Sequence, residues 1–148
     1  MSFFGNHDVN DISDNPNELP PNTYKFRVIS AKFAPTQGGD KHGITFKYQI
    51  VEGPYATFFP LTDWVRVPVN DVPKDEEERL LSYLKMRLLA FGFSLDEIQE
   101  FGPGQVNDTV NRMFFGTTGL RKDKNGQTNI RVNKFDPVSD DTDVMDDI

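Results

Sequence analysis

The chain has 148 residues, a length that suits one folded domain with a single core. It contains no cysteine, which excludes disulfides, thiolate metal sites and a cysteine nucleophile. Its net charge of −7 would, taken alone, also argue against a nucleic-acid ligand.

The chain begins with a segment that lacks the marks of a folded element. Residues 1–22 are rich in Asn, Asp and Pro, and we expect them to form a flexible acidic arm. The alternation that follows predicts a strand with Tyr24, Phe26 and Val28 on one face. Beyond Val28 the apolar residues change parity. This indicates either a β-bulge near Val28–Ile29 or a strand that bends until both of its faces are buried.

Two further strands follow a loop. Residues 35–43 are rich in Gly, which predicts the loop. Residues 44–51 alternate again and predict a second strand. Residues 56–69 predict a longer, irregular third strand, in which Pro60 argues for a sheet edge or a break.

The period of the apolar residues then changes from that of a strand to that of a helix. Leucines recur at helical spacing through residues 74–91, and Gly92 suits the position that follows a helix. The sequence Ser-Leu-Asp-Glu at 94–97 is a capping-box pattern, which predicts a second, short helix ending near Phe101.

Two strands near the C-terminus form a predicted hairpin around Asp-Lys-Asn-Gly at 123–126. A two-residue Asn–Gly loop would pair Arg121 with Ile130. A three-residue loop, with Gly126 in the left-handed conformation, would pair Leu120 with Ile130. We favour the three-residue loop because it keeps the apolar residues together.

The order of these elements predicts the fold class. Three strands, a helical segment at 74–101 and two final strands predict a mainly β domain over residues 23–135. This is the order of an OB-fold-like five-stranded barrel with the helical segment between strands 3 and 4, an architecture that often binds oligonucleotides. A small β-sandwich can share the same order.

The charges are segregated along the chain. Residues 1–22 carry −4 and residues 136–148 carry −6, with no Lys or Arg in either segment. Residues 71–108 carry −5, whereas the strand segments 23–70 and 109–135 together carry +8. The sequence therefore predicts a basic body of strands within an anionic chain. That pattern argues against an acidic mimic of DNA, which would spread negative charge over its folded surface.

Basic and aromatic side chains alternate with apolar ones on the predicted strands. A cationic groove attracts a phosphate backbone, and exposed aromatic rings stack on unpaired bases without reading their identity. Trp64 is as compatible with a core position as with stacking, and we expect Phe135 to point outward because Ile130 and Val132 point inward. The candidate nucleic-acid-binding residues are Lys25, Arg27, Lys47, Phe58, Trp64, Arg66, Arg112, Arg121, Lys122, Arg131, Lys134 and Phe135.

Signatures of catalysis and of targeting are missing from the sequence. The only histidines are His7 and His42, and no nucleophile-elbow or phosphate-loop motif occurs. We therefore expect a non-enzymatic protein without a metal or other cofactor. The N-terminal residues lack the basic and apolar regions of a signal peptide, and no stretch approaches the roughly 20 apolar residues that span a bilayer. We expect a soluble, cytoplasmic protein with no membrane partner.

Three stretches of the sequence resemble a known protein family. They are LPPNTYKFRVISAKFAPTQGG at 19–39, GITFKYQIVEGPY at 43–55 and the KNG hairpin at 124–126. They are similar to a family of bacteriophage single-stranded DNA-binding proteins, long catalogued as a phage domain of unknown function. The resemblance covers about residues 19–135, with Asn22 where the family commonly has Gly. It implies an OB-like protein that coats and protects single-stranded DNA during phage replication or recombination, independently of sequence, in the host bacterial cytoplasm.

The segment 136–148 is similar to the acidic tails of bacterial single-strand-binding proteins, which recruit replication and repair enzymes. We expect it to be disordered, to compete with DNA for the basic groove and to recruit replication or recombination proteins. Those tails end in Asp-Asp-Ile-Pro-Phe, whereas this chain ends in Met-Asp-Asp-Ile, which favours a phage-encoded partner. The candidate partner-binding residues are Asp140, Asp141, Asp143, Asp146, Asp147 and Ile148.

A different class of function stays open. The β-sheet would instead serve as a protein-interaction or virion-assembly module with no nucleic-acid ligand. Such a module would form a stable complex with another protein, and oligo-dT would not quench the fluorescence of Trp64. Homo-oligomers are compatible with either interpretation, and the sequence does not decide between a monomer and an oligomer.

Overall fold

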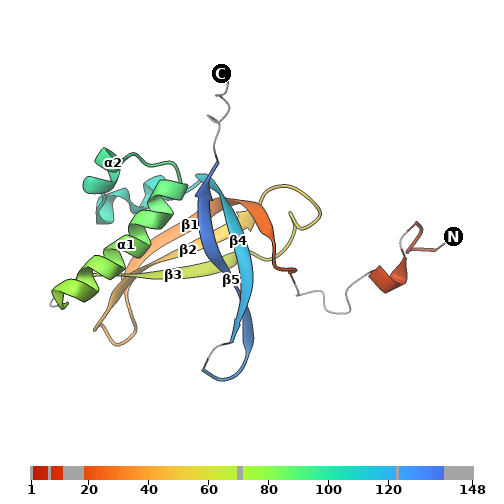
Figure 1. The fold of residues 1–148 in the computed structure, drawn as a ribbon, viewed down its shortest axis with the longest axis horizontal. Helices are drawn as coiled ribbons and strands as arrows, with labels where there is room; N and C mark the ends of the chain where they lie inside the picture. The colour runs from red at the N-terminus through yellow and green to blue at the C-terminus, as the bar shows by residue number, and fades with distance from the viewer. Residues whose placement is uncertain (1, 7, 12–18, 70–71, 123, 139–148) are drawn as a thin grey trace, which may run out of the picture.

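The computed structural model describes residues 2–6, 8–11, 19–69, 72–122 and 124–138 (Figure 1). A short 3₁₀ helix, η1, lies near the N-terminus, and a second, η2, precedes the last two strands. The elements in chain order are η1 (Val9–Asp11), β1 (Thr23–Pro35), β2 (His42–Ile50), β3 (Leu61–Val67), α1 (Lys74–Ala90), α2 (Leu95–Gln99), η2 (Pro103–Thr109), β4 (Met113–Lys122) and β5 (Thr128–Pro137). No helix in the described part of the chain is long and apolar enough to cross a membrane.

The strands form one antiparallel sheet in the order β3-β2-β1-β4-β5. This confirms a mainly β fold with the helical segment between the third and fourth strands. Figure 1 shows the β4–β5 hairpin running steeply across β1, β2 and β3, so the sheet is strongly curled. No ladder joins β3 to β5 among the described strands, and the sheet therefore stays open where a barrel would close.

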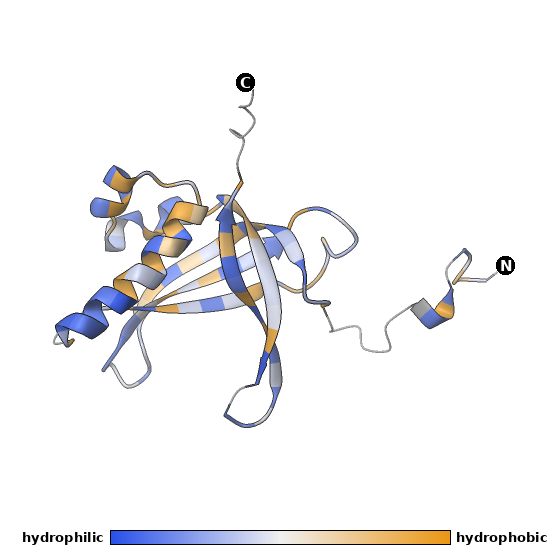
Figure 2. Cartoon of the chain, viewed as in Figure 1, coloured by the Kyte–Doolittle hydropathy of each residue, from blue (hydrophilic) through white to orange (hydrophobic). Residues whose placement is uncertain are grey.

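The core lies on the inner face of this curled sheet and is rich in aromatic rings. The buried Tyr48 ring lies 4.8 Å from the ring of Phe114 and 6.1 Å from that of Phe91, measured between centroids. Leu84 and Leu88 of α1 are buried against the same cluster. Figure 2 shows that the first turns of α1 are hydrophilic, as expected where acidic residues favour the positive end of the helix dipole.

The predicted bulge in the first strand is confirmed. The register of β1 against β2 shifts between Val28 and Ser30, so that Ile29 has no partner on β2 and is exposed. The backbone groups of Val28 bond instead to Arg112 and Asn111, which precede β4. The bulge therefore lets β1 pair with β2 on one side and β4 on the other while the sheet curls.

The predicted register of the final hairpin is also confirmed. Leu120 pairs with Ile130, and Gly126 has a φ of +83°, the left-handed conformation that favours glycine. The ladder ends at the pair Lys122–Thr128, so the connection is longer than the three residues expected.

The orientation predicted for Phe135 is wrong. The register of β4 against β5 shifts between Thr117 and Thr118, and the extra residue on β5 is Asn133. This second bulge reverses the alternation, so Phe135 points into the core, where it is 7% exposed and stacks on Phe114 at 5.4 Å.

The third strand is shorter than expected, and the two 3₁₀ helices were not expected. Residues 51–60 form turns, and β3 begins directly after Pro60. The side-chain amide of Gln49 holds these turns by donating to the carbonyl oxygens of Ala56 and Phe58, each at 2.9 Å. The helix predicted at 74–91 is confirmed, and so is the short helix predicted after the capping box at 94–97, which ends at Gln99. No element was predicted from the sequence for the residues that form η2.

The folded body extends beyond both predicted boundaries. Leu19 is fully buried in the core, and the backbone carbonyl of Asn22 accepts hydrogen bonds from the backbone and side chain of Thr118. At the other end Asp136 and Pro137 belong to β5. Of the rest of the predicted arm, residues 2–6 and 8–11 are described and contain η1. Residues 1, 7 and 12–18 of the arm and 139–148 of the tail lie outside the described residues.

Candidate nucleic-acid interface

The outer face of the sheet, opposite the aromatic core, gathers cationic side chains. Residues paired directly across antiparallel strands share a face, so the ladders identify its members. Arg27 lies opposite Gln49, and Lys47 lies opposite both Ser30 and Thr62. In β1, β2 and β3 the cations on this outer face are Lys25, Arg27, Lys32, Lys47 and Arg66, and no outward position on these three strands holds Asp or Glu.

Trp64 lies on this outer face and not in the core. Its partner across β2 is Thr45, and its side chain packs directly over Gly43. A Cβ added to Gly43 would lie 2.4 Å from the indole, so only glycine leaves space for the ring. The indole nevertheless remains 42% exposed. The sequence left open whether Trp64 lies in the core or on the surface, and the structure places it on the surface. Its ring is accessible to a ligand.

A groove of about 620 Å³ continues from Trp64 between the edges β3 and β5, with α1 along one side. We call it the β3–β5 groove. It brings together five of the predicted residues, which are Trp64, Arg66, Arg121, Arg131 and the largely buried Phe135. Among the described residues Arg121 and Arg131 form no ion pair, so both guanidinium groups are available to an anion.

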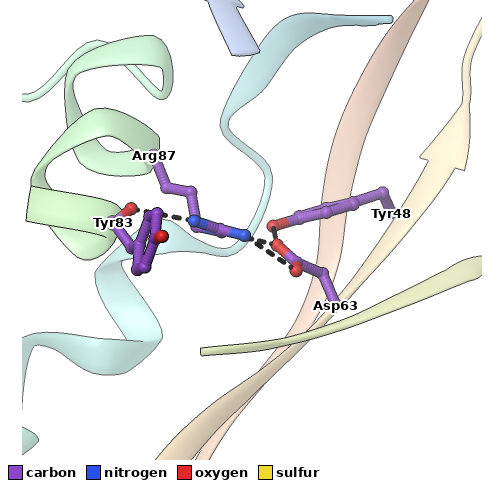
Figure 3. Close-up of polar contacts among 4 residues, drawn as sticks. All are labelled: Tyr48, Asp63, Tyr83 and Arg87. Atoms are coloured by element: carbon purple, nitrogen blue, oxygen red, sulfur yellow. Dashed lines mark hydrogen bonds and ion pairs between the residues drawn. The ribbon is translucent and has the colours of Figure 1, made fainter. Parts of the chain in front are cut away.

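An ion pair fixes α1 against the sheet beneath this groove (Figure 3). Nε and Nη2 of Arg87 donate to the two carboxylate oxygens of Asp63 at 2.7 and 3.1 Å, and Nη1 donates to the carbonyl oxygen of Tyr83 at 2.9 Å. The hydroxyl of Tyr48 donates to the same carboxylate. The guanidinium also lies 4.6 Å from the ring centroid of Phe135 on β5. Arg87 therefore links α1 to both open edges of the sheet.

The buried position of this cluster changes the acidity of its members. Burial, followed by the negative charge of Asp63, raises the pKa of the Tyr48 hydroxyl well above its usual value. Burial lowers the pKa of Arg87, but the hydrogen bonds and charge of Asp63 outweigh it and the net pKa is raised. The Tyr48 hydroxyl therefore keeps its proton at physiological pH beside the Asp63–Arg87 ion pair.

Other shifts arise from local structure away from the groove floor. Hydrogen bonds from the backbone and side chain of Ser94 lower the pKa of Glu97, as expected in a capping box. A hydrogen bond from Thr36 lowers the pKa of Asp40, with a smaller contribution from the charge of Arg66. Burial, then the nearby Tyr55, raises the pKa of Tyr24. In the described part of the chain no group of His, Asp and Glu is arranged to hold a metal ion.

Some predicted residues lie outside this surface. Arg112 stacks on Phe93 at 4.1 Å beside the helical segment, in a hollow that also contains Asp96, Glu97 and Asp108. Its surroundings are therefore acidic and unsuited to a phosphate. Phe58 is partly buried in the turns at 51–60, and Phe135 lines the groove but is only 7% exposed because its ring packs in the core.

The remaining predicted cations are near the surface but not all are free. Lys25 lies 4.0 Å from Glu52, and the exposed Lys134 lies 3.9 Å from Asp136. Lys122 is exposed at the end of β4. The predicted tail residues Asp140, Asp141, Asp143, Asp146, Asp147 and Ile148 lie outside the described residues.

The groove also contains residues that the sequence analysis missed. Tyr83 and Met86 of α1 are 51% and 38% exposed, and Leu120 of β4 is 54% exposed. The signal for the first two was their position outside the buried leucine stripe of an otherwise charged helix. Lys32 was missed on the outer face, although the shifted parity after the bulge points it outward.

No protein-family model matches the sequence, and the search of curated proteins found no match either.

Proposed function

We propose that the protein binds single-stranded DNA, coating and protecting it independently of sequence during phage replication or recombination. The observation that carries the proposal is the continuous surface formed by the outer face and the β3–β5 groove. It joins Arg121 and Arg131, which form no ion pair among the described residues, to an exposed indole within a chain of net charge −7. Such a combination suits a phosphate backbone with unstacked bases.

The strand order supports an OB-like interpretation of the fold. In a five-stranded OB barrel the first, second and third strands are neighbours and the fourth lies beside the first, as here. The fifth strand would close the barrel by meeting the third. In this protein the β3–β5 groove lies at that place, with Arg87 bridging the two edges. We interpret the fold as an OB-like barrel that is open at its binding site.

The aromatic part of the surface favours single strands over duplexes. Stacking on Trp64 needs a base whose face is free, and a paired base within a duplex is already covered by its neighbours. The cations act on any nucleic acid, because a phosphate backbone is the same in both forms. The preference for single strands therefore depends on Trp64 and the apolar side chains beside it.

The acidic C-terminal segment has a regulatory role in this proposal. Its carboxylates compete with phosphates for the cations of the groove, and its end recruits replication or recombination proteins. No catalytic step or cofactor is part of the proposal. We place the protein in the cytoplasm of the host cell, where such DNA is replicated.

Titration with oligo-dT tests the proposal directly, because Trp64 is the only tryptophan in the chain. We expect oligo-dT to quench and shift its fluorescence, with an affinity that falls steeply as salt rises. Duplex DNA of the same length should compete weakly. Unchanged fluorescence at low salt, together with no change in the anisotropy of a labelled oligonucleotide, would refute DNA binding.

A protein-interaction module is the second candidate, and one observation favours it. A hollow of about 730 Å³ between α1 and α2 exposes Leu81 and Leu95, which are 45% and 63% accessible. Exposed apolar surface of this kind often marks a protein contact. Under this alternative a protein partner would be retained by the immobilised chain, and substitution of Leu95, not of Trp64, would abolish the complex.

A further inference from the structure

Arg66 lies where the outer face meets the β3–β5 groove, but a carboxylate partly neutralises its charge. Its Nη1 lies 3.3 Å from Oε2 of Glu76, in the first turn of α1. The same oxygen lies 3.7 Å from Nη2 of Arg79. Glu76 is therefore shared between a cation of the sheet and a cation of its own helix.

The hydrogen bonding of Arg66 is incomplete in this arrangement. Its Nε is buried and has no acceptor among the described residues. A buried donor without an acceptor is unfavourable, and a guanidinium binds best to two acceptor oxygens at once. Glu76 gives Arg66 one long contact, whereas a phosphate offers several oxygens.

We infer that Arg66 is a phosphate-binding subsite that Glu76 keeps closed in the free protein. A backbone phosphate of the nucleic acid displaces the carboxylate and takes the guanidinium. The inference rests on the proposed binding of single-stranded DNA and adds a regulation of that same site.

The exchange does not leave Glu76 without a cation. Arg79 already contacts it, and the Arg79 side chain is 62% exposed, so it can follow the carboxylate as Arg66 leaves. The side chains of Arg66 and Glu76 are 24% and 31% exposed, and Arg66 lines the groove. The contact is thus a weak, solvent-screened ion pair that a multivalent anion can replace.

Two variants that each remove one negative charge show whether the contact between Glu76 and Arg66, and not the total charge of the protein, lowers the affinity for DNA. Glu76→Gln removes the competing charge and keeps the side-chain shape. Glu77→Gln is the matched control, because it removes the same charge from the same helical turn, and Glu77 is exposed and forms no ion pair among the described residues. The affinity of each for labelled oligo-dT is measured by anisotropy across a range of salt concentrations. We expect Glu76→Gln to bind about two- to fivefold more tightly than Glu77→Gln at low salt, the range expected when a surface ion pair is removed.

Introducing both substitutions into the Arg66→Gln variant shows whether the gain in affinity depends on the Arg66 guanidinium. In that background Glu76→Gln should gain no more affinity than Glu77→Gln does. Equal affinities of the two single variants, or an undiminished gain without Arg66, would overturn the inference and leave the proposed function standing. A parent protein that fails to bind oligo-dT would overturn both.

Discussion

Trp64 owes its exposure to the glycine beneath it. A side chain at position 43 would occupy the space of the indole, so the pair Gly43 and Trp64 places an aromatic ring on the surface of the sheet without burying it. A ring held in this way loses little conformational freedom when a base stacks on it.

Replacing this ring is expected to weaken DNA binding with little loss of stability. Trp64→Ala should cost about 1 kcal/mol or more of binding free energy, the lower end of the range for one stacked base. Labelled oligo-dT and anisotropy provide the measurement, since the intrinsic signal is lost with the indole. Phe3→Ala, which removes a ring that is 99% exposed outside the groove, is the control. Equal affinities of the two variants would count against stacking at Trp64.

Tyr48 gives the fold a dependence on alkaline pH. Burial and the negative charge of Asp63 raise the pKa of its hydroxyl. The folded chain therefore holds this proton more tightly than the unfolded chain does. The contribution of this proton to the free energy of unfolding is complete below the pKa of about 10 that tyrosine has in the unfolded chain. It is lost as the pH rises towards and through the pKa of the folded chain, at up to about 1.4 kcal/mol per pH unit.

Urea denaturation between about pH 9 and about pH 11 tests this dependence, since that interval spans the unfolded pKa. The parent protein should lose stability more steeply than Tyr48→Phe, in which the other tyrosines and the lysines still titrate. At neutral pH the variant should be less stable by about 1 kcal/mol, because Asp63 loses a donor. Parallel pH profiles would show that the folded and unfolded chains hold the Tyr48 proton equally tightly, and would contradict a raised pKa in the fold.

Helix α1 is the element that turns an open sheet into a binding site. It covers the core with Leu84 and Leu88 and supplies Tyr83 to the wall of the groove. Its position depends on the pair Arg87–Asp63, whose side chains are only 12% and 14% exposed.

Breaking this pair on one side should destabilise the protein strongly. Arg87→Met leaves the carboxylate of Asp63 buried without its cation, which costs about 3 kcal/mol or more. The double variant Arg87→Met with Asp63→Asn should recover much of the loss, because no uncompensated charge remains. Arg79→Met, an exposed position on the same helix, should change the free energy of unfolding by less than about 0.5 kcal/mol. Urea denaturation compares them, and a double variant no more stable than Arg87→Met would exclude this explanation.

The elements were more predictable from the sequence than the site was. Alternation and helical spacing locate the strands and α1 because these patterns reflect local geometry. Phe135 was misplaced because a bulge at Asn133 reverses the alternation, and such a bulge depends on pairing with a distant strand. Tyr83 was missed for a related reason, since its place in the groove depends on how α1 docks on β3 and β5.

At the scale of the whole molecule, the outer face of β1, β2 and β3 carries cations and no Asp or Glu, although Lys25 and Arg66 pair with carboxylates of neighbouring segments. The cations of β1, β2 and β3 share the outer face, whereas the acidic helical segment surrounds Arg112 on another side. An anionic chain can therefore present a locally cationic surface, because at about 0.1 M salt charges more than about 10 Å apart are largely screened from one another. Distant carboxylates repel DNA only weakly, unless a segment of the chain brings them to the groove.

Residues 139–148 are the segment that can do so, since only Val138 separates them from β5 and they contain five Asp and no Lys or Arg. Deleting them should tighten binding to oligo-dT by roughly an order of magnitude at low salt, because carboxylates joined to the domain compete at a high effective concentration. The gain in affinity should shrink as the salt concentration rises, since screening weakens the competing carboxylates.

A full-length variant with those five Asp replaced by Asn is the control for chain length, and it should bind like the deletion. If the deletion tightens binding and the Asn variant does not, bulk and not charge obstructs the groove. An affinity that is unchanged in both at every salt concentration would rule out competition by the tail.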